Sequence, residues 1–308
     1  MKIQRVRFLG IRGLADASYD FTNPGTGTPH DLVVLTGRPG CGTTRMLEAI
    51  IAAKEAIAPY GPMATNPASW CSAEAGAAKV AFEFYLDEEE RSFAGTDSAV
   101  VEAEAMFMPG RTQSEADEGI RAVLDRYAHT SQVGKLEYFP SSRRIPRLGP
   151  FGGLAQLEQR LMRTSKDAEK YGFIPRFLQV LEKEVEVARA FAERLATLSP
   201  TCRYERDGTM APVPRCFTSR GGERLRYNEI SDAEADAVIF AATAVAIDLS
   251  CSLVLVDRPE IFVHPIFVKS FIAGLRGLGT DNQLILASPS PEIIAAAEPG
   301  VVVQLEAS

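Results

Sequence analysis

The alternation of apolar and polar residues divides the two ends of the chain into strands and helices. Strands with one buried face are expected where the two kinds alternate, at residues 2–9, 79–86 and 99–108. Strands buried on both faces, as in a parallel sheet, are expected at the continuous apolar runs 31–36, 252–256 and 283–287. Residues 44–58 place apolar side chains at helical spacing. This pattern predicts an α/β fold.

The middle of the chain has a different pattern. Residues 113–128 and 154–198 are charged, rich in Ala, Glu, Lys and Arg, and punctuated by Gly and Pro, so we expect a helical lobe there. Residues 174–198 form one predicted helix with its apolar positions in nearly a single stripe. This stripe either packs against the lobe or binds a partner. A short strand at residues 135–140 and a basic turn at residues 141–147 interrupt the lobe.

Composition and charge limit the classes of function. The chain has 308 residues, 46% of them apolar, which suffices for one large α/β domain or for a domain with an inserted lobe. A net charge of −7 and a pI near 5.2 exclude a surface that is basic throughout. Arg143, Arg144 and Arg147 form the one local basic patch. Because no window holds about 20 apolar residues, we expect a cytoplasmic protein without a membrane span.

The five cysteines and three histidines show no metal-ligand spacing. Free thiols in a reducing compartment are therefore expected. Cys202 and Cys216 flank the turn dipeptide Asp207-Gly208, so a disulfide across two strands stays open as an alternative.

A glycine-rich segment joins the apolar run at residues 31–36 to the predicted helix at residues 44–58. Glycines in such a place let consecutive N–H groups and the helix N-terminus approach phosphate closely. The pattern G-x-x-x-x-G-K-[ST] is met except at its lysine, where Thr43 stands. Taken alone, the segment is either a phosphate loop or a plain glycine-rich turn. As a phosphate loop it would bind nucleotide through Gly37, Arg38, Gly40, Cys41, Gly42, Thr43, Thr44 and Arg45.

Further segments in the same order point to one family. Residues 253–257 (LVLVD) are a buried strand ending on Asp257, where a carboxylate would reach Mg²⁺ beside the phosphates. Residues 258–265 read RPEIFVHP, residues 228–234 read NEISDAE, and residues 283–292 read QLILASPSPE. With the opening MKIQRVRFLGIRGL and the segment YFPSSR, they resemble the motifs of ABC-type ATPase heads of the SMC, RecF and OLD group. These heads are P-loop NTPases and include proteins described as AAA ATP-binding domains.

The resemblance implies a mainly parallel core sheet, N-terminal antiparallel strands and an inserted helical lobe. It divides the chain into an N-terminal ATPase lobe with the phosphate loop (residues 1–110), the helical lobe (residues 111–200) and a C-terminal ATPase lobe (residues 201–308). The C-terminal lobe would carry the signature-like, Walker B-like and switch-like segments.

The resemblance also implies roles for particular residues. Thr44 and Asp257 would lie on the Mg²⁺ side of bound ATP. The signature-like residues Ser231, Ala233 and Glu234 would close over the nucleotide of a second head, with Ala233 in place of the signature glycine.

At the positions whose residues take part in ATP cleavage in this group, the chain has other residue types. Thr43 replaces the Walker lysine, Arg258 the catalytic glutamate and Pro289 the switch histidine, whereas Glu260 and His264 keep the group's residues. Proline cannot donate even a backbone hydrogen bond. Because phosphoryl transfer depends on positioning and on cationic stabilisation, we expect a pseudo-ATPase that acts as a scaffold or regulatory subunit.

The state of the site stays open at this point. Arg258 either replaces the charge missing at Thr43, so that ATP with Mg²⁺ is held without cleavage, or it pairs with Glu260 or a partner and no nucleotide binds. Arg38 is a further candidate for that charge, and Arg45 is expected to point away from the loop.

The partner and the process stay open as well. The partner is either a second copy of the chain or another ATPase or effector subunit. The alternative function is a slow or partner-completed ATPase in a DNA-associated repair or phage-defence system, for which the patch around Arg143 offers a phosphate contact.

Overall fold

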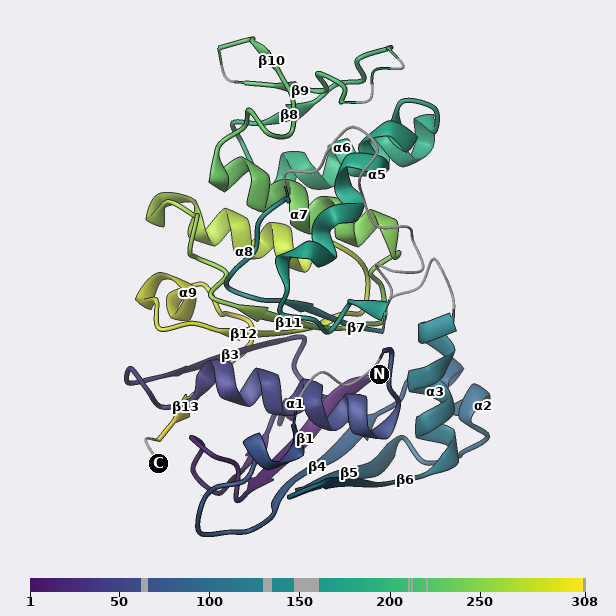
Figure 1. Ribbon diagram of the computed structural model, residues 1–308, viewed down its shortest axis with the longest axis vertical. Coiled ribbons are helices and arrows are strands. Elements are labelled where there is room, and N and C mark those ends of the chain that lie inside the picture. Colours follow the sequence, from purple (N-terminus) through teal and green to yellow (C-terminus); the bar gives the residue numbers. More distant parts are fainter. Residues whose placement is uncertain are drawn as a thin grey trace.

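The fold is built in layers around one long helix. The computed structural model describes residues 1–61, 66–129, 135–146, 161–209, 211, 213–219 and 221–306, with only the backbone of residues 127–129. Figure 1 shows α1 (Thr43–Ile57) between an antiparallel sheet and a parallel sheet, with α5, α6, α7 and α8 beyond the parallel sheet. No helix in the described part of the chain is long and apolar enough to cross a membrane.

The antiparallel sheet packs one face against α1. Its strands lie in the order β2-β1-β4-β5-β6. They are β1 (Lys2–Leu9), β2 (Ala17–Asp20), β4 (Ala78–Tyr85), β5 (Val100–Met108) and β6 (Arg111–Ala116). Apolar and polar residues alternate along β4, so the apolar ones enter the core beneath α1 and the polar ones face outward. Two helices, α2 (Glu88–Ala94) and α3 (Glu118–His129), lie at one end.

The parallel sheet is buried on both faces. Its strands, in the order β13-β3-β12-β11-β7, are β13 (Val301–Leu305), β3 (Leu32–Gly37), β12 (Gln283–Ala287), β11 (Leu253–Asp257) and β7 (Leu136–Phe139). Val33 and Leu35 of β3 enter the core that contains α1, whereas Val34 enters the core on the opposite face. This double burial explains why the central strands read as continuous apolar runs.

The opposite face of the parallel sheet is covered by helices that precede or follow its strands. They are α7 (Asp232–Ala246), α8 (Val268–Arg276), α9 (Pro291–Ala295), α5 (Ile174–Leu181) and α6 (Val185–Leu198), with short 3-10 helices at Ala168–Phe173 and Pro265–Phe267. A further 3-10 helix, Pro67–Ser69, contacts β5 of the antiparallel sheet. A small sheet of β8 (Arg203–Tyr204), β9 (Phe217–Thr218) and β10 (Arg224–Leu225) lies at the far end of the lobe. The predicted parallel core sheet, antiparallel strands and helical lobe are confirmed.

Two predicted helices differ from the structure. Residues 113–116 belong to β6, which pairs with β5 across the turn at Gly110 (φ 78°), and the helix begins only at Glu118. Residues 174–198 form two helices, with Glu184 in an extended conformation before the second, and the Glu182 carboxylate between them accepts hydrogen bonds from the N–H groups of Asp207 and Gly208. Most of their stripe packs within the lobe, where Leu178, Leu181, Ala188, Phe191 and Leu195 are buried, whereas Val185 at the start of α6 is exposed.

The strand pairings cross the predicted domain limits. The pair β5–β6 spans residue 110, and the parallel sheet takes strands from all three predicted parts. The three-part division stays a prediction.

All five cysteines are free, and the hydrogen bond from the Glu205 N–H to the Cys216 oxygen sets a register in which Cys202 does not face Cys216.

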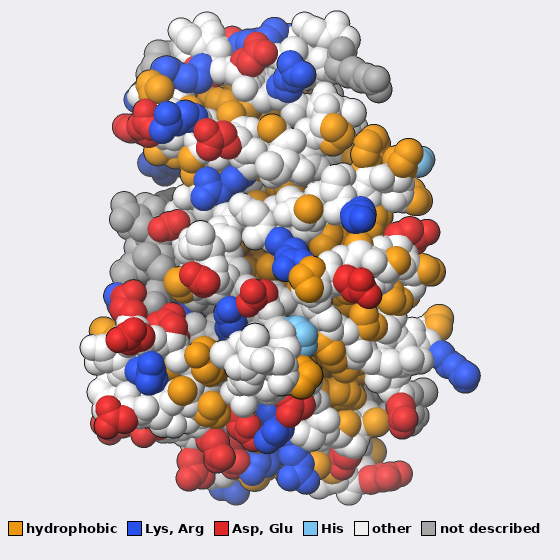
Figure 2. Space-filling view, turned by 180° about the vertical axis from the view of Figure 1, so that it is seen from behind, with side chains coloured by type: hydrophobic (Ala, Val, Ile, Leu, Met, Phe, Trp, Pro, Cys, Tyr) orange, Lys and Arg blue, Asp and Glu red, His pale blue; other side chains and the backbone are white. Residues whose placement is uncertain are grey.

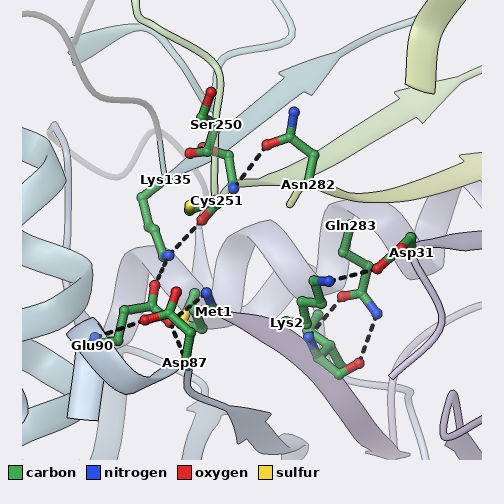
Figure 3. Close-up of polar contacts among 12 residues, drawn as sticks. Met1, Lys2, Asp31, Asp87, Glu90, Lys135, Ser250, Cys251, Asn282 and Gln283 are labelled. Carbon is green, nitrogen blue, oxygen red and sulfur yellow. Dashed lines mark hydrogen bonds and ion pairs between the residues drawn. The ribbon is translucent and has the colours of Figure 1, made fainter. Parts of the chain in front are cut away.

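Gln283 joins the two large sheets. Its side-chain oxygen accepts a hydrogen bond from the Ile3 N–H at 2.7 Å, and its amide nitrogen donates to the Ile3 and His30 oxygens at 2.9 and 3.1 Å (Figure 3). Lys135 makes a second connection, because its ammonium contacts Glu90 of α2 and the Cys251 oxygen before β11. The antiparallel sheet is thereby fixed to the start of β12 and β11.

We expect Gln283→Leu to lower the free energy of unfolding by about 3 kcal/mol, because the substitution leaves buried backbone groups of Ile3 without a partner. Chemical denaturation of both proteins measures the loss. Gln113→Leu, at an exposed position of β6, is the matched control and should change stability little. Equal losses in the two variants would contradict the assignment.

A buried pair of charges lies near the C-terminal end of α1. The ammonium of Lys54 is 3.0 Å from a carboxylate oxygen of Glu55, which also accepts hydrogen bonds from Thr164 and from the Tyr60 N–H. Burial lowers the pKa of Lys54 to about 7, although Glu55 opposes the shift. The far end of this helix is therefore tied to the lobe through the hydrogen bond between Thr164 and Glu55, beside a lysine whose pKa burial lowers to about 7.

The contribution of Lys54 to the free energy of unfolding should rise between pH 7 and pH 10.5. In this window folded Lys54 is neutral, whereas the unfolded chain keeps the ordinary lysine pKa of 10.5 and binds one more proton. The slope contributed by Lys54 reaches about 1.4 kcal/mol per pH unit. Denaturation at several pH values should give a smaller slope for Lys54→Met than for wild type. Lys269→Met, at an exposed position, should leave the slope unchanged.

Candidate functional site

The glycine-rich loop borders a cavity at the carboxyl ends of three parallel strands. Residues 37–42 join β3 to α1, and the cavity beside them has a volume of about 480 Å³. The ends of β11 and β12 contribute Asp257 and Ala287 to its wall. The predicted residues that line it are Gly37, Arg38, Gly40, Gly42, Thr43, Thr44, Arg45, Asp257, Arg258 and Pro289. Cys41 is instead buried beneath the loop.

At Gly42 another part of the main chain packs directly against the loop, so that a side chain would not fit there. Gly42 has φ 95°, and a Cβ there would lie 2.4 Å from the Gly13 oxygen. It is also the N-cap of α1, and no side chain caps that end. Since the first turn of an α-helix leaves its N–H groups without partners in the helix, this end of α1 can bind an anion such as phosphate.

The two predicted Mg²⁺-side residues lie next to each other. The hydroxyl of Thr44 donates to a carboxylate oxygen of Asp257 at 2.9 Å, although 213 positions separate them in the sequence. Asp257 is buried at the end of β11, with 3% of its surface exposed. Hard oxygen donors of this kind fit Mg²⁺ that is also bound by phosphate. In the described part of the chain, no cluster of three His, Cys, Asp or Glu residues fits a metal bound by protein alone.

The cavity carries a positive charge in an acidic protein. Four arginines and two carboxylates line it, which gives 4 − 2 = +2, whereas the whole chain carries −7. Arg45 is held away from the loop, since it donates to the Ser69 and Arg12 oxygens and lies 3.8 Å from the centre of the Trp70 ring. Arg38 and Arg258 are exposed, and neither side chain has a polar partner among the described residues.

Arg258 has an unusual backbone conformation. Its φ of 49° lies in the left-handed region, and its N–H donates to the Ala287 oxygen at 2.9 Å. The structure has no ion pair between Arg258 and Glu260, whose carboxylate accepts a hydrogen bond from Ser288 at 2.8 Å. Arg258 instead lines the cavity. Pairing of Arg258 with a partner stays a prediction.

Thr43 and Pro289, which stand where the group has a lysine and a histidine, supply neither an ammonium nor an imidazole. Thr43 is the first residue of α1 and brings a hydroxyl to the cavity in place of an ammonium. Pro289 follows β12, is exposed and lines the cavity without a donor. His264 caps the short helix Pro265–Phe267, where its Nδ1 accepts from the Ile266 N–H at 3.3 Å.

The signature-like residues lie apart from the phosphate loop. Ser231 is the N-cap of α7 and forms a capping box with Glu234, in which the Ser231 N–H donates to the Glu234 carboxylate at 2.9 Å. Ala233 is exposed on the first turn of α7. Their neighbours Asp232 and Ala235 line a second cavity of about 570 Å³. The structure therefore does not bring Ser231, Ala233 and Glu234 to the phosphate cavity.

The predicted basic patch does not form. Arg143 is buried and pairs with Asp236 of α7 at 2.6 Å, because its guanidinium finds carboxylate and carbonyl acceptors inside the fold. Arg144 is exposed, and Arg147 lies outside the described residues. Of the described residues in this turn, Arg144 alone is exposed as a cation.

Sequence reasoning missed several residues of the site. Arg12, Gly13 and Glu48 line the phosphate cavity, and Arg12 and Gly13 belong to the opening segment IRGL that carried part of the resemblance. Glu48 lies one turn beyond Thr44 on α1, where helical spacing would have placed it. Asp236 gave no signal, because a single aspartate in an apolar helix has no motif.

Comparison with known proteins identifies the fold. No family model and no curated protein sequence matches the chain. A crystal structure of an SMC head bound to the C-winged helix domain of ScpA matches with a TM-score of 0.60 and 17% identity, over 98% of this chain and 93% of that one. The Smc head of Pyrococcus furiosus, with an extended coiled coil and bound to the C-terminal domain of ScpA, gives 0.59 and 14% over 99% and 94%. The recombination mediator RecF gives 0.55 and 9% over 99% and 96%. The chain has the fold of these SMC heads and of RecF.

We expect Gly42→Ala to lower the free energy of unfolding by more than about 2 kcal/mol, since its Cβ meets the Gly13 oxygen and the residue keeps a positive φ. Gly40→Ala is the matched control. It has φ 87° but open space around the added Cβ, so only the conformational cost of about 1 kcal/mol applies. Chemical denaturation separates the two costs, and a larger loss for Gly40→Ala would refute the close approach.

Proposed function

We propose that this chain, which has the fold of an SMC or RecF ATPase head, holds ATP with Mg²⁺ without cleaving it and serves as a scaffold or regulatory subunit beside a protein partner. One observation carries the proposal. The same cavity combines a phosphate loop and the Thr44–Asp257 pair with an arginine and a proline at the positions that would activate water and sense the γ-phosphate.

The residues present fit a triphosphate. The first turn of α1 offers N–H donors, and the net charge of the cavity attracts an anion. The Thr44 hydroxyl and the Asp257 carboxylate would hold Mg²⁺, which supplies charge neutralisation for the phosphates when it is bound. Arg258 and Arg38 line the cavity, and no other described residue offers either guanidinium a polar contact, so each can pair with phosphate oxygens.

The same residues do not support cleavage. Hydrolysis needs a base or a polar group that orients water, and Arg258 is a cation that cannot accept a proton. Pro289 offers no donor for charge developing on the γ-phosphate. Losing one such group typically costs orders of magnitude in rate. We therefore infer that the chain uses nucleotide as a ligand and not as a substrate.

An exposed apolar segment supports the proposed protein partner. Ile261, Ile266 and Phe267 lie in the ten residues after Asp257, with 44%, 75% and 43% of their surfaces exposed. Large apolar side chains gathered in one exposed segment are typical of interaction sites. The two matched SMC heads are bound to domains of ScpA, a protein partner. A second copy of this chain and a different subunit are the two candidates.

The DNA-associated alternative has less support. It depended on the arginine patch, and Arg143 is buried. On the face shown in Figure 2, the Lys and Arg side chains are interspersed with Asp and Glu. A surface that binds DNA phosphates gathers positive charge on one face.

A fluorescent ATP analogue should bind the wild-type chain in the presence of Mg²⁺. Arg258→Ala should weaken binding by about tenfold or more, because a charge-assisted contact to phosphate is lost. Asp257→Ala should remove the dependence on Mg²⁺. Arg144→Ala, an exposed arginine that does not line this cavity, should bind as wild type does.

Phosphate release measured on the same samples completes the test. Wild type should release no more phosphate than the background. Failure to bind at millimolar nucleotide would refute the holding of ATP. Turnover by wild type that falls in Asp257→Ala would replace the proposal with a slow ATPase.

A further inference from the structure

Arg143 is a buried arginine that uses all of its hydrogen-bond donors. A guanidinium has five N–H groups. Nε and Nη2 donate to the two carboxylate oxygens of Asp236, at 2.6 and 3.3 Å. Nη1 donates to the backbone oxygens of Pro140 and Asp257, both at 2.8 Å, and Nη2 also donates to the Arg258 oxygen at 3.2 Å. None of this side chain is exposed to solvent. One residue thus fastens three segments to one another.

One of these segments, the Asp257–Arg258 turn at the end of β11, has an unusual backbone conformation. A left-handed φ at a non-glycine residue is strained and persists only where its surroundings hold it. Two contacts do so here: the Arg258 N–H donates to the Ala287 oxygen, and the Arg258 oxygen accepts from Arg143. The conformation of this turn sets where the Arg258 side chain lies in the phosphate cavity.

The other end of the Arg143 contacts lies on α7. Asp236 is in the second turn of this helix, and 2% of its surface is exposed. Arg143 and Asp236 both line the second cavity, together with Asp232 on the first turn of α7. The guanidinium therefore lies between the start of α7 and the turn that borders the phosphate cavity.

We propose that Arg143 is a positioning residue that holds the Asp257–Arg258 turn at a fixed place relative to the start of α7. The proposal rests on the proposed nucleotide site, because the turn carries Asp257 and Arg258 into it. The affinity for nucleotide thereby depends on the contacts that Arg143 makes with Asp236 and with the turn.

The five acceptors around residue 143 can all be reached by a guanidinium but not by the ammonium of a lysine. The five acceptors surround a planar group on several sides, whereas an ammonium presents three donors from one point. Arg143→Lys keeps the positive charge beside Asp236 and so avoids leaving a buried carboxylate unpaired. It loses part of the set of contacts to the backbone of the turn. It is therefore the variant that separates positioning from charge.

Hydrogen exchange of the turn tests the proposal without nucleotide. We expect the Arg258 N–H to exchange roughly tenfold faster in Arg143→Lys than in wild type, while the amides of β3 stay unchanged. Asp236→Asn serves as a second variant and should accelerate the same amide, because it weakens the hold on the guanidinium. Arg144→Lys, at the exposed neighbouring position, is the matched control and should exchange as wild type does. An unchanged turn in both buried variants overturns the proposal.

A double-mutant cycle with the fluorescent ATP analogue tests the link to the cavity. Arg258→Ala should weaken binding in wild type and should have a clearly smaller effect in the Arg143→Lys background, with a difference of roughly tenfold. A merely stabilising role of Arg143 would give equal effects in both backgrounds, and that result overturns the proposal. If wild type binds no nucleotide, the proposed function fails, and the exchange experiment still decides the role of Arg143.

Discussion

Parallel pairing of β3, β12 and β11 is the constraint on which the site depends. The carboxyl ends of parallel strands meet at one edge of a sheet, so residues 37, 257 and 287 border a single cavity. Both faces of this sheet are buried, and a slip of one residue would move the side chains of a whole strand from one core to the other. The fold therefore fixes the distance between Thr44 and Asp257 before any ligand enters.

Two departures from the ABC-type pattern change the charge of the cavity in opposite directions. A threonine in place of lysine removes one positive charge, and an arginine in place of glutamate adds two, so the pair of changes makes the cavity more positive by one. Arg258 lies beside the buried carboxylate of Asp257 and lines the same cavity. The charge of the cavity is therefore consistent with the proposed binding of an anion.

The sequence predicted the parts of the fold that depend on local pattern. The buried strands β3, β11 and β12 and helix α1 were expected within one or two residues, because apolar runs and glycine punctuation are local signals. The break after Leu181 was not expected, and the hydrogen bonds that Glu182 accepts there come from backbone groups 25 and 26 positions away, which no local pattern shows. The motif residues of the phosphate cavity were placed by resemblance, and the sheet brings them together.

The contacts of individual arginines could not be predicted in this way. Arg143 and Arg144 are neighbours with the same side chain, yet one is buried and the other exposed. The difference arises from Asp236, 93 positions further along the chain, and from carbonyl oxygens at the end of β11. A charge run in a sequence shows where cations are, whereas the tertiary fold decides which of them meet solvent.

The two ends of β12 lie at different parts of the structure. One end of this five-residue strand is hydrogen-bonded through Gln283 to the antiparallel sheet, and Pro289 follows closely beyond the other end, where it lines the phosphate cavity. A single short strand therefore spans the distance from the antiparallel sheet to the cavity wall, and the place of Pro289 depends on the same strand that holds the two sheets together.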